Sequence, residues 1–208
     1  ILDGNRRFAK RLMKQPWKGH EWGAAKIEHV IDWSSEMGIQ ELTMYAFSVQ
    51  NFNRPKKEFD FLMDVFRKEF DRMCEPDQQE KLAKEGVQID FIGRMKLFAP
   101  DIQEKMKRLM KLTAKNDKMK VHFAMAYGGQ EEILDAIAAL SKKIRTGDIN
   151  EITRELFEDH LYMKSAPDLI IRTGGDRRTS NFLTWQSSYS EWLFLEKFWP
   201  EFDKTDLI

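Results

Sequence analysis

The sequence of 208 residues lacks several features that would place it in a well-defined class. Its single cysteine, Cys74, excludes an intrachain disulfide, and no cysteine–histidine spacing typical of a zinc site is present. The 34 Lys and Arg residues balance the 34 Asp and Glu residues, so the positive field expected of a nucleic-acid-binding protein is absent. No apolar run reaches the ~18 residues of a membrane span, and no signal peptide is present, so we expect a cytoplasmic protein.

The composition does supply a full hydrophobic core. Hydrophobic residues make up 42% of the chain and aromatic residues 12%, which excludes global disorder. Short apolar runs, such as 42–47, 87–92, 121–127 and 168–171, alternate with segments of helical character, among them 8–14, 56–73, 76–85 and 152–161, of which 56–73 is the clearest. Strands separated by helices favour right-handed crossovers. We therefore predict one α/β domain over residues 1–208, with a mostly parallel central sheet flanked by helices.

A polar loop follows the last of these runs. Residues Arg172 to Asn181 include two adjacent glycines, three arginines and several hydroxyl side chains. Glycines allow a close approach of the backbone to a ligand, and guanidinium groups match phosphate oxygens. Ligands of open α/β sheets also bind beyond the carboxyl ends of strands. The loop therefore predicts a diphosphate site. Because it matches no known nucleotide fingerprint, a solvated turn remains the alternative.

Two other loops after predicted strands have similar content. The turn from Asp3 to Arg7 holds a carboxylate, a glycine and two arginines at a predicted helix start, which favours an anion. Asp3 could hold Mg²⁺ through one oxygen, although it could instead only cap the helix. The loop from Ser48 to Pro55 adds Arg54, although turn chemistry alone would explain its asparagines and proline. We expect the three loops to meet at one edge of the sheet.

In order and from end to end, these motifs resemble those of the cis-prenyltransferases, or Z-isoprenyl diphosphate synthases. The matching segments are Asp3–Ala9, Gly19–His20, Tyr45–Pro55, Ala126–Gly129, Arg172–Asp176, Ser180–Glu191 and Trp199–Phe202. The similarity is greatest to the archaeal-type homodimeric enzymes. It implies Mg²⁺-dependent, successive condensation of isopentenyl diphosphate onto an allylic primer, farnesyl or geranylgeranyl diphosphate. The product would be a long polyprenyl diphosphate with Z double bonds, the precursor of a lipid carrier.

The resemblance also implies roles for individual residues. The allylic diphosphate would contact Gly4, Asn5, Arg6, Arg7, Phe8 and His20. The diphosphate of isopentenyl diphosphate would contact Arg172, Arg178, Thr179 and Ser180. The catalytic residues would be Asp3 and Asn51, with Ser48, Val49, Gln50, Phe52 and Arg54 beside the condensing carbons. Mg²⁺ would bind Asp3, and Glu191 would reach the metal site of the partner subunit in a homodimer.

The apolar product requires a tunnel, for which Phe59, Leu62, Met63 and Phe66 would form one wall and Ile102 the far end. Ordinary core packing is the alternative for these side chains. Peripheral membrane contact for product release is a further expectation. The sequence departs from the family at Arg6, at Arg177 and before His20, where Lys18 could replace a missing arginine. The family's first strand and C-terminal tail are expected to be missing from this chain.

The sequence also bears on two other functions. A non-catalytic partner subunit should have lost the Asp-Gly-Asn turn at residues 3–5, which this chain keeps. An E-type prenyl synthase should carry Asp-Asp-x-x-Asp clusters, and no adjacent aspartates occur. Both functions are therefore disfavoured.

Overall fold

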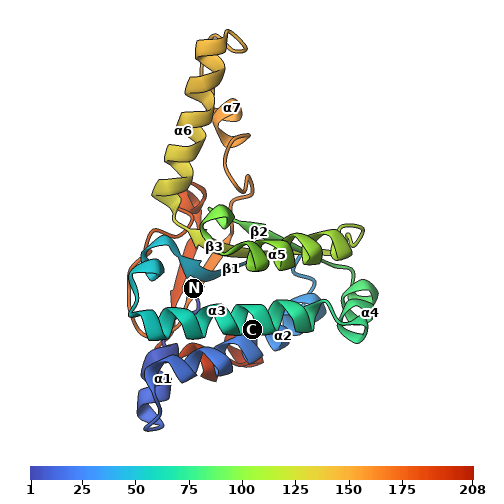
Figure 1. Cartoon of the computed structure of the whole chain (residues 1–208), viewed down its shortest axis with the longest axis vertical. Helices are drawn as coiled ribbons and strands as arrows, with labels where there is room; N and C mark the ends of the chain where they lie inside the picture. Colours follow the sequence, from blue (N-terminus) through green and yellow to red (C-terminus); the bar gives the residue numbers. More distant parts are fainter.

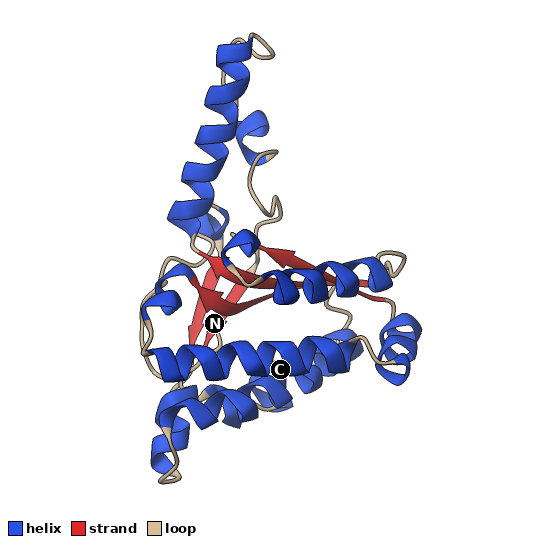
Figure 2. Ribbon diagram, in the orientation of Figure 1, coloured by secondary structure: helices blue, strands red, loops and turns tan.

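The computed structural model describes residues 1–208 and contains two sheets in which every strand pair is parallel. The first sheet has the order β1-β3-β2, formed by Glu41–Ser48, Met119–Tyr127 and Val87–Ile92. The second pairs β4 (Leu169–Arg172) with β5 (Glu191–Phe194). The central strand β3 is buried from Val121 onward, which is typical of parallel strands covered on both faces (Figure 2).

Seven α-helices surround the sheets. They are α1 (Asn5–Arg11), α2 (Gly19–Glu36), α3 (Lys56–Met73), α4 (Pro76–Glu85), α5 (Pro100–Thr113), α6 (Gly129–Thr146) and α7 (Arg154–Glu158). The long helices α2 and α3 lie side by side against one face of the β1-β3-β2 sheet, and α6 with α7 projects away from the body as an arm (Figure 1). None of the helices is long and apolar enough to cross a membrane.

The apolar spacing of α3 explains its position. Phe59, Leu62, Phe66, Phe70 and Met73 recur three or four residues apart, and Leu62, Met63, Phe70 and Met73 are buried in the main core together with strands β1, β2 and β3. Pro55 precedes the helix and fixes its start. The helix therefore runs along the sheet from the loop after β1.

The predicted α/β class, with a parallel sheet flanked by helices, is confirmed. The predicted boundaries of α3, α4 and β2 coincide with the observed ones. Helix α1 was predicted at 8–14 but spans Asn5–Arg11, because Met13 adopts a left-handed conformation (φ 54°) that ends the helix. Helix α7 is much shorter than the predicted 152–161, and Phe157 is its only buried residue.

A groove of about 610 Å³ separates β1 from β4, the facing edges of the two sheets. The backbone nitrogen of Ile1 donates to the carbonyl of Ile171 (2.5 Å), and the Thr173 N–H donates back to the carbonyl of Ile1 (3.3 Å). Residues 1–2 thus lie against the end of β4, where the end of a strand was predicted, although they are not a strand themselves. This contact places Asp3 beside the carboxyl end of β4.

Candidate functional site

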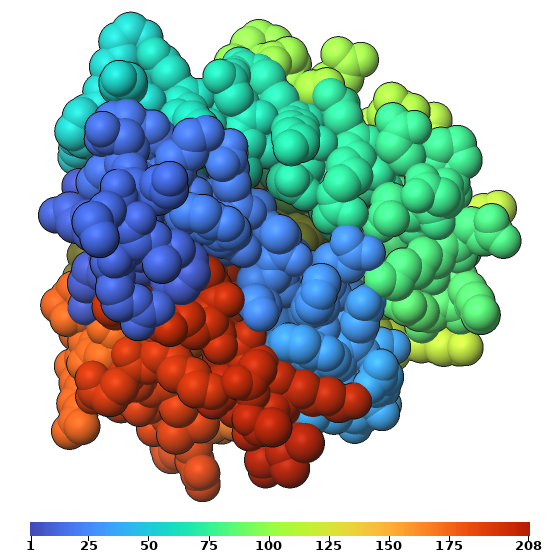
Figure 3. Space-filling view, turned by 90° about the horizontal axis from the view of Figure 1, so that it is seen from below, coloured from blue at the N-terminus to red at the C-terminus, as the bar shows by residue number.

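A cavity of about 570 Å³ lies between α2, α3 and the carboxyl ends of β1 and β4. Its polar end is lined by Asp3, Asn5, His20, Ser48, Gln50, Asn51, Arg54, Arg172 and Ser180. Its other part is mainly apolar, with side chains of α2, α3 and β3 that include Ile27, Leu62, Phe66, Phe70 and Phe123. Figure 3 shows the surface hollowed between α2 and α3. The cavity therefore suits a molecule with a charged head and an apolar tail.

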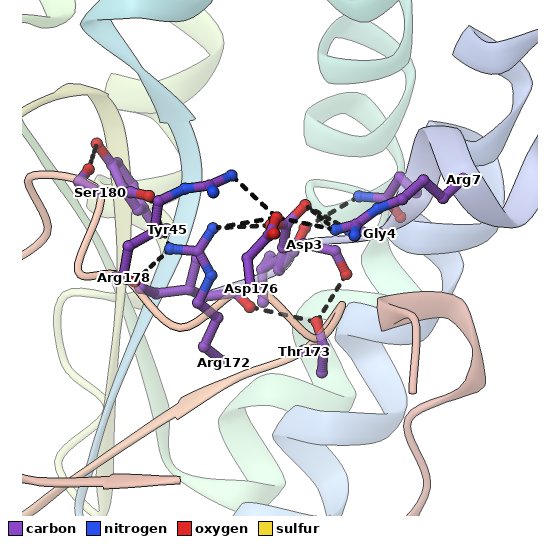
Figure 4. A network of polar contacts seen from close by, with 12 residues as sticks. Asp3, Gly4, Arg7, Tyr45, Arg172, Thr173, Asp176, Arg178 and Ser180 are labelled. Carbon is purple, nitrogen blue, oxygen red and sulfur yellow. Dashed lines mark hydrogen bonds and ion pairs between the residues drawn. The ribbon is translucent and has the colours of Figure 1, made fainter. Parts of the chain in front are cut away.

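Asp3 is the centre of the polar end (Figure 4). Its Oδ1 accepts from the Gly4 N–H (2.6 Å) and lies 3.3 Å from Arg7 Nη2, and its Oδ2 accepts from Arg172 Nη2 (2.8 Å). Partial burial acts to raise the pKa of Asp3, but the hydrogen bond and charge of Arg172, aided by Gly4 and Arg7, hold that pKa below its ordinary value. Asp3 is therefore ionised at neutral pH.

Arg172, the last residue of β4, joins two of the predicted loops. Its side chain is only 3% exposed and donates to Asp3, to Ser180 Oγ (2.7 Å) and to the Arg178 carbonyl. Thr173 Oγ1 donates to the Asp3 carbonyl (2.8 Å), which ties the turn at Asp3 to the same strand end. The loops at Asp3 and Arg172 thus meet, as predicted, although no strand precedes Asp3.

Gly174 packs closely against the turn at Asp3. Its φ is +93°, and a Cβ there would lie 2.7 Å from Arg7 Nη2 and 3.2 Å from the carbonyl carbon of Asp3. Its N–H donates to the Lys197 carbonyl (2.7 Å), and the Gly175 N–H donates to Leu195 (2.9 Å). The glycine pair therefore lets the chain pack against the turn at Asp3, and its amides are already bonded.

Asp176 adds a second carboxylate beside the arginines. Its Oδ2 accepts from Arg178 Nη2 (2.9 Å) and Arg7 Nη2 (3.2 Å) and lies 3.9 Å from Arg172 Nη2. Arg178 itself is 63% exposed. The arginines of the two loops are thus held together by Asp3 and Asp176.

Ser180 and Asn181 both adopt left-handed backbone conformations, with φ of 52° and 62°. Such residues cost about 1–3 kcal/mol each and are retained where the surroundings fix them. Here the Tyr45 hydroxyl donates to the Ser180 carbonyl (3.3 Å), and Asn181 Nδ2 donates to Glu131 Oε2 (2.7 Å). The strained turn directs Ser180 Oγ toward Arg172.

A third carboxylate, Glu58, balances cations on the opposite wall. This buried side chain accepts from Arg54 Nη1 and lies 3.5 Å from both His20 Nε2 and Arg6 Nε. The His20 hydrogen bond, together with Arg54 and Arg6, outweighs burial and lowers the pKa of Glu58 to about 2. Burial lowers the pKa of His20. Glu58 therefore stays charged and fixes Arg54 and His20 at the cavity wall.

The structure brings most predicted site residues to one place, with differences. Several of them surround the cavity without lining it: Gly4, Arg6, Arg7, Phe8, Val49, Phe52, Arg178 and Thr179. Phe52 packs against Phe47 (ring centroids 5.1 Å apart), and Phe8 packs against Trp22 (5.4 Å). Glu191 is exposed at the start of β5, opposite Leu169, whereas Asp3 contacts Arg172 at the other end of β4. Within one chain, Glu191 therefore does not join Asp3.

Sequence reasoning missed Glu58 and Asp176 as the partners of the arginines, and Tyr45 as the support of Ser180. Asp176 had a signal, since it lies between the arginines of the loop. No signal in the sequence pointed to Glu58, because an acidic residue in the first turn of a helix is ordinary.

The tunnel wall also differs from the prediction. Leu62 and Phe66 line the cavity, but Phe59 and Met63 do not. Ile102 is fully buried in the main core and does not line the cavity. Its predicted position at the far end of the tunnel is therefore not supported, because that face of α5 packs into the core.

The residues present fit a metal shared with a substrate better than one held by the protein alone. No group of three or more His, Cys, Asp or Glu side chains could hold a metal ion. Asp3 is a cavity-lining, ionised carboxylate that is 29% exposed. Mg²⁺ usually keeps several waters and binds one or two carboxylates together with substrate phosphates. Asp3 meets that requirement.

Comparisons with known proteins agree along the whole chain. The family model described as "Putative undecaprenyl diphosphate synthase" matches residues 1–208. The tritrans,polycis-undecaprenyl-diphosphate synthase (geranylgeranyl-diphosphate specific) of Methanocaldococcus jannaschii is 42% identical, over 100% of this chain and 75% of that protein. An isoprenyl transferase of Thermotoga maritima is 41% identical, over 100% of this chain and 88% of that protein.

A solved structure extends the similarity to three dimensions. Lavandulyl diphosphate synthase from Lavandula x intermedia, in complex with dimethylallyl diphosphate, superposes with a TM-score of 0.93 at 34% identity, over 100% of this chain and 89% of that one. Fold, motifs and relatives thus agree. The chain belongs to the undecaprenyl diphosphate synthase family of cis-prenyltransferases.

Proposed function

We propose that this cis-prenyltransferase condenses isopentenyl diphosphate successively onto an allylic diphosphate, farnesyl or geranylgeranyl diphosphate, to make a long Z-polyprenyl diphosphate. The observation that carries the proposal is the continuity of an arginine-rich pocket with an apolar cavity along α3. A prenyl diphosphate has the same two parts. Its head would meet the guanidinium groups, and its tail would replace water against apolar side chains.

The charge balance of the polar end supports the binding of more than one anion. Five guanidinium groups, those of Arg6, Arg7, Arg54, Arg172 and Arg178, surround the three carboxylates of Asp3, Glu58 and Asp176. The excess is two positive charges, before any contribution from His20. We assign the allylic diphosphate to the turn at Gly4–Arg7 with His20, and isopentenyl diphosphate to Arg172, Arg178, Thr179 and Ser180.

The proposed catalysis consists mainly of charge stabilisation. The allylic carbon–oxygen bond breaks and leaves negative charge on the departing diphosphate, which fixed guanidinium groups stabilise without reorganisation. Arg7 and Arg172 are fixed by Asp3 and Asp176, and Arg54 by Glu58. Ser48 and Asn51, which line the cavity nearby, are proposed to position the reacting carbons. Mg²⁺, when bound to Asp3 and the diphosphate, would neutralise further charge on the leaving group.

We also propose that the enzyme is a homodimer joined through the arm of α6 and the neighbouring strand edge. Leu134, Ile137 and Ile144 are 60%, 44% and 42% exposed on α6, and Leu169 and Leu193 are exposed on β4 and β5. Exposed apolar surface on a projecting helix marks a protein interface. Glu191 begins β5 beside this surface, which is consistent with its proposed reach into a partner's metal site. A Leu134→Glu, Ile137→Glu variant should sediment as a monomer.

The experiment that tests the function is incubation of the protein with Mg²⁺, isopentenyl diphosphate and primers of several lengths. Mass analysis should detect prenyl diphosphates that grow by single isoprene units. Asp3→Ala should lower their formation by ~10²–10³, which excludes a contaminating enzyme. If the intact protein makes no product with any primer, the alternative of a non-catalytic partner subunit replaces the proposal.

A further inference from the structure

The apolar part of the cavity ends at charged residues. Along α3 the cavity is lined by Leu62, Val65, Phe66, Phe70 and Met73, but also by Glu69 and Arg72. A helix rises about 1.5 Å per residue, so Arg72 lies about 15 Å beyond Leu62 along α3, on the side away from Arg54. An apolar chain growing from the polar end along α3 would therefore reach these charges last.

Glu69 and Arg72 belong to a cluster of ion pairs that joins three helices, here called the charged clasp: Glu28, Asp32, Glu69, Arg72 and Lys81. Arg72 Nε donates to Glu69 Oε2 (2.9 Å) within α3, and Arg72 Nη1 donates to Glu28 Oε2 on α2 (2.8 Å). Lys81 Nζ on α4 donates to Glu28 Oε1 (3.0 Å) and lies 2.8 Å from Asp32 Oδ1. The clasp thus holds α2 and α3 together beyond the hollow that separates them.

The clasp is partly buried, with side chains 22–34% exposed, so its ion pairs are less screened than those of an open surface. The pKa of Glu28 is lowered, since the hydrogen bonds and charges of Lys81 and Arg72 outweigh the effect of burial. An apolar chain gains free energy while it replaces water against apolar side chains, and it gains none against charged groups that must stay paired and hydrated. Elongation beyond Met73 therefore loses its driving force.

We propose that the charged clasp limits the length of the product by ending the apolar cavity, with Arg72 as the residue that determines this specificity. The inference rests on the proposed chain elongation. It differs from the sequence-based expectation that the bulk of Ile102 ends the tunnel, because Arg72 lines the cavity and Ile102 does not.

The competing interpretation is that the clasp only stabilises the packing of α2, α3 and α4. The chain offers a matched control in Arg67, which lies on the same helix and is 35% exposed, against 34% for Arg72. Arg67 also makes two ion pairs, with Asp64 (3.0 Å) and Asp101 (2.6 Å), but does not line the cavity. A loss of stability alone should therefore affect Arg67 and Arg72 variants alike.

The test compares Arg72→Met and Arg67→Met with the unmodified enzyme. Methionine keeps an unbranched apolar stem and removes the charge. Each protein is incubated with Mg²⁺, isopentenyl diphosphate and geranylgeranyl diphosphate, the products are measured by mass, and a melting curve is recorded. The rate of the first condensation is measured separately, because it reports the polar end of the cavity and not the clasp.

We expect Arg72→Met to shift the most abundant product by at least one isoprene unit toward longer chains, with less than a twofold change in the first condensation. Glu28→Gln should shift the products in the same direction, Arg72→Lys should shift them less, and Arg67→Met should leave them unchanged. Unchanged or shorter products from Arg72→Met, or equal shifts from Arg67→Met, would overturn the proposal. Absence of the first condensation in the unmodified enzyme would instead overturn the proposed function.

Discussion

Replacing Glu58 by glutamine should cost the protein a large part of its stability while leaving the shape of the side chain unchanged. Glu58 is buried between Arg54, His20 and Arg6, and its pKa is lowered from 4.5 to about 2 by the His20 hydrogen bond and the two arginines. Each pKa unit corresponds to about 1.36 kcal/mol, so the charged form of Glu58 contributes on the order of 3 kcal/mol. Removal of one partner of a buried ion pair typically costs a similar ~3–5 kcal/mol.

The pH dependence has a definite sign. The pKa of Glu58 is lower in the folded state, so its contribution is fully present above pH 4.5 and is lost as the pH falls toward about 2. Urea denaturation at pH 7 should therefore show Glu58→Gln to be less stable by ~3 kcal/mol, and its stability should fall less steeply below pH 4.5. A loss of ~3 kcal/mol lowers the Tm of a chain of this size by roughly 6–12 °C.

Asp60→Asn is the matched control on the same helix. Asp60 also pairs with a cation four residues earlier, Lys56 (2.6 Å), but its side chain is 52% exposed. Exposed pairs of this kind contribute ~0.3–0.5 kcal/mol, so the control should be nearly as stable as the unmodified protein. If Glu58→Gln matches the unmodified protein at pH 7, or keeps the same acid dependence, Glu58 does not anchor Arg54 and His20.

Three other changes test the site. Asp3→Ala should lower turnover by ~10²–10³ at saturating Mg²⁺. It should also lower the free energy of unfolding by ~1.5–3 kcal/mol, because the buried Arg172 loses a partner. Retained activity would contradict the catalytic role of Asp3. Arg178→Ala should raise the KM for isopentenyl diphosphate more than the KM for the primer. Arg172→Ala should impair the use of both substrates, because Arg172 also holds Asp3. Steady-state kinetics with each substrate varied in turn measures these effects. Gly174→Ala should destabilise the protein by more than ~1 kcal/mol and reduce activity, because the added Cβ would meet Arg7 and Asp3. The control is Gly147→Ala, where φ is similar (+78°) but the space around the residue is open, so its melting curve measures the backbone cost alone.

The parts of the fold that were predictable from the sequence depend on local patterns. The apolar spacing of 56–73 gave the bounds of α3, and the polar residues after the strands indicated the edge at which Asp3, Ser48 and Arg172 meet. Parallel strands place their carboxyl ends together, so this convergence needed no knowledge of the packing. The fold class and the place of the site therefore followed from short segments of the chain.

The contacts inside the site were not predictable in the same way, because they join residues far apart in the chain. Glu58 lies 38 residues from His20, and Arg172 lies 169 residues from Asp3. Apolar spacing also does not say whether a side chain faces a cavity or the core, which is why Ile102 was misplaced and Arg72 was overlooked. The packing of Gly174 against the turn at Asp3, which its missing Cβ permits, also joins distant residues and was not predicted.

The carboxylates of the site resolve a difficulty that its arginines create. Five guanidinium groups close together would repel one another, and Asp3, Asp176 and Glu58 offset that repulsion. The three carboxylates differ in access, because Glu58 is buried away from the cavity lining whereas Asp3 lines it and Asp176 is partly exposed. A diphosphate could therefore compete with Asp3 and Asp176 for Arg7, Arg172 and Arg178 but leave the Glu58 contacts intact. The released Asp3 oxygens would then be available to a metal that arrives with the diphosphate, so the same residue would hold the arginines before binding and the cation afterwards.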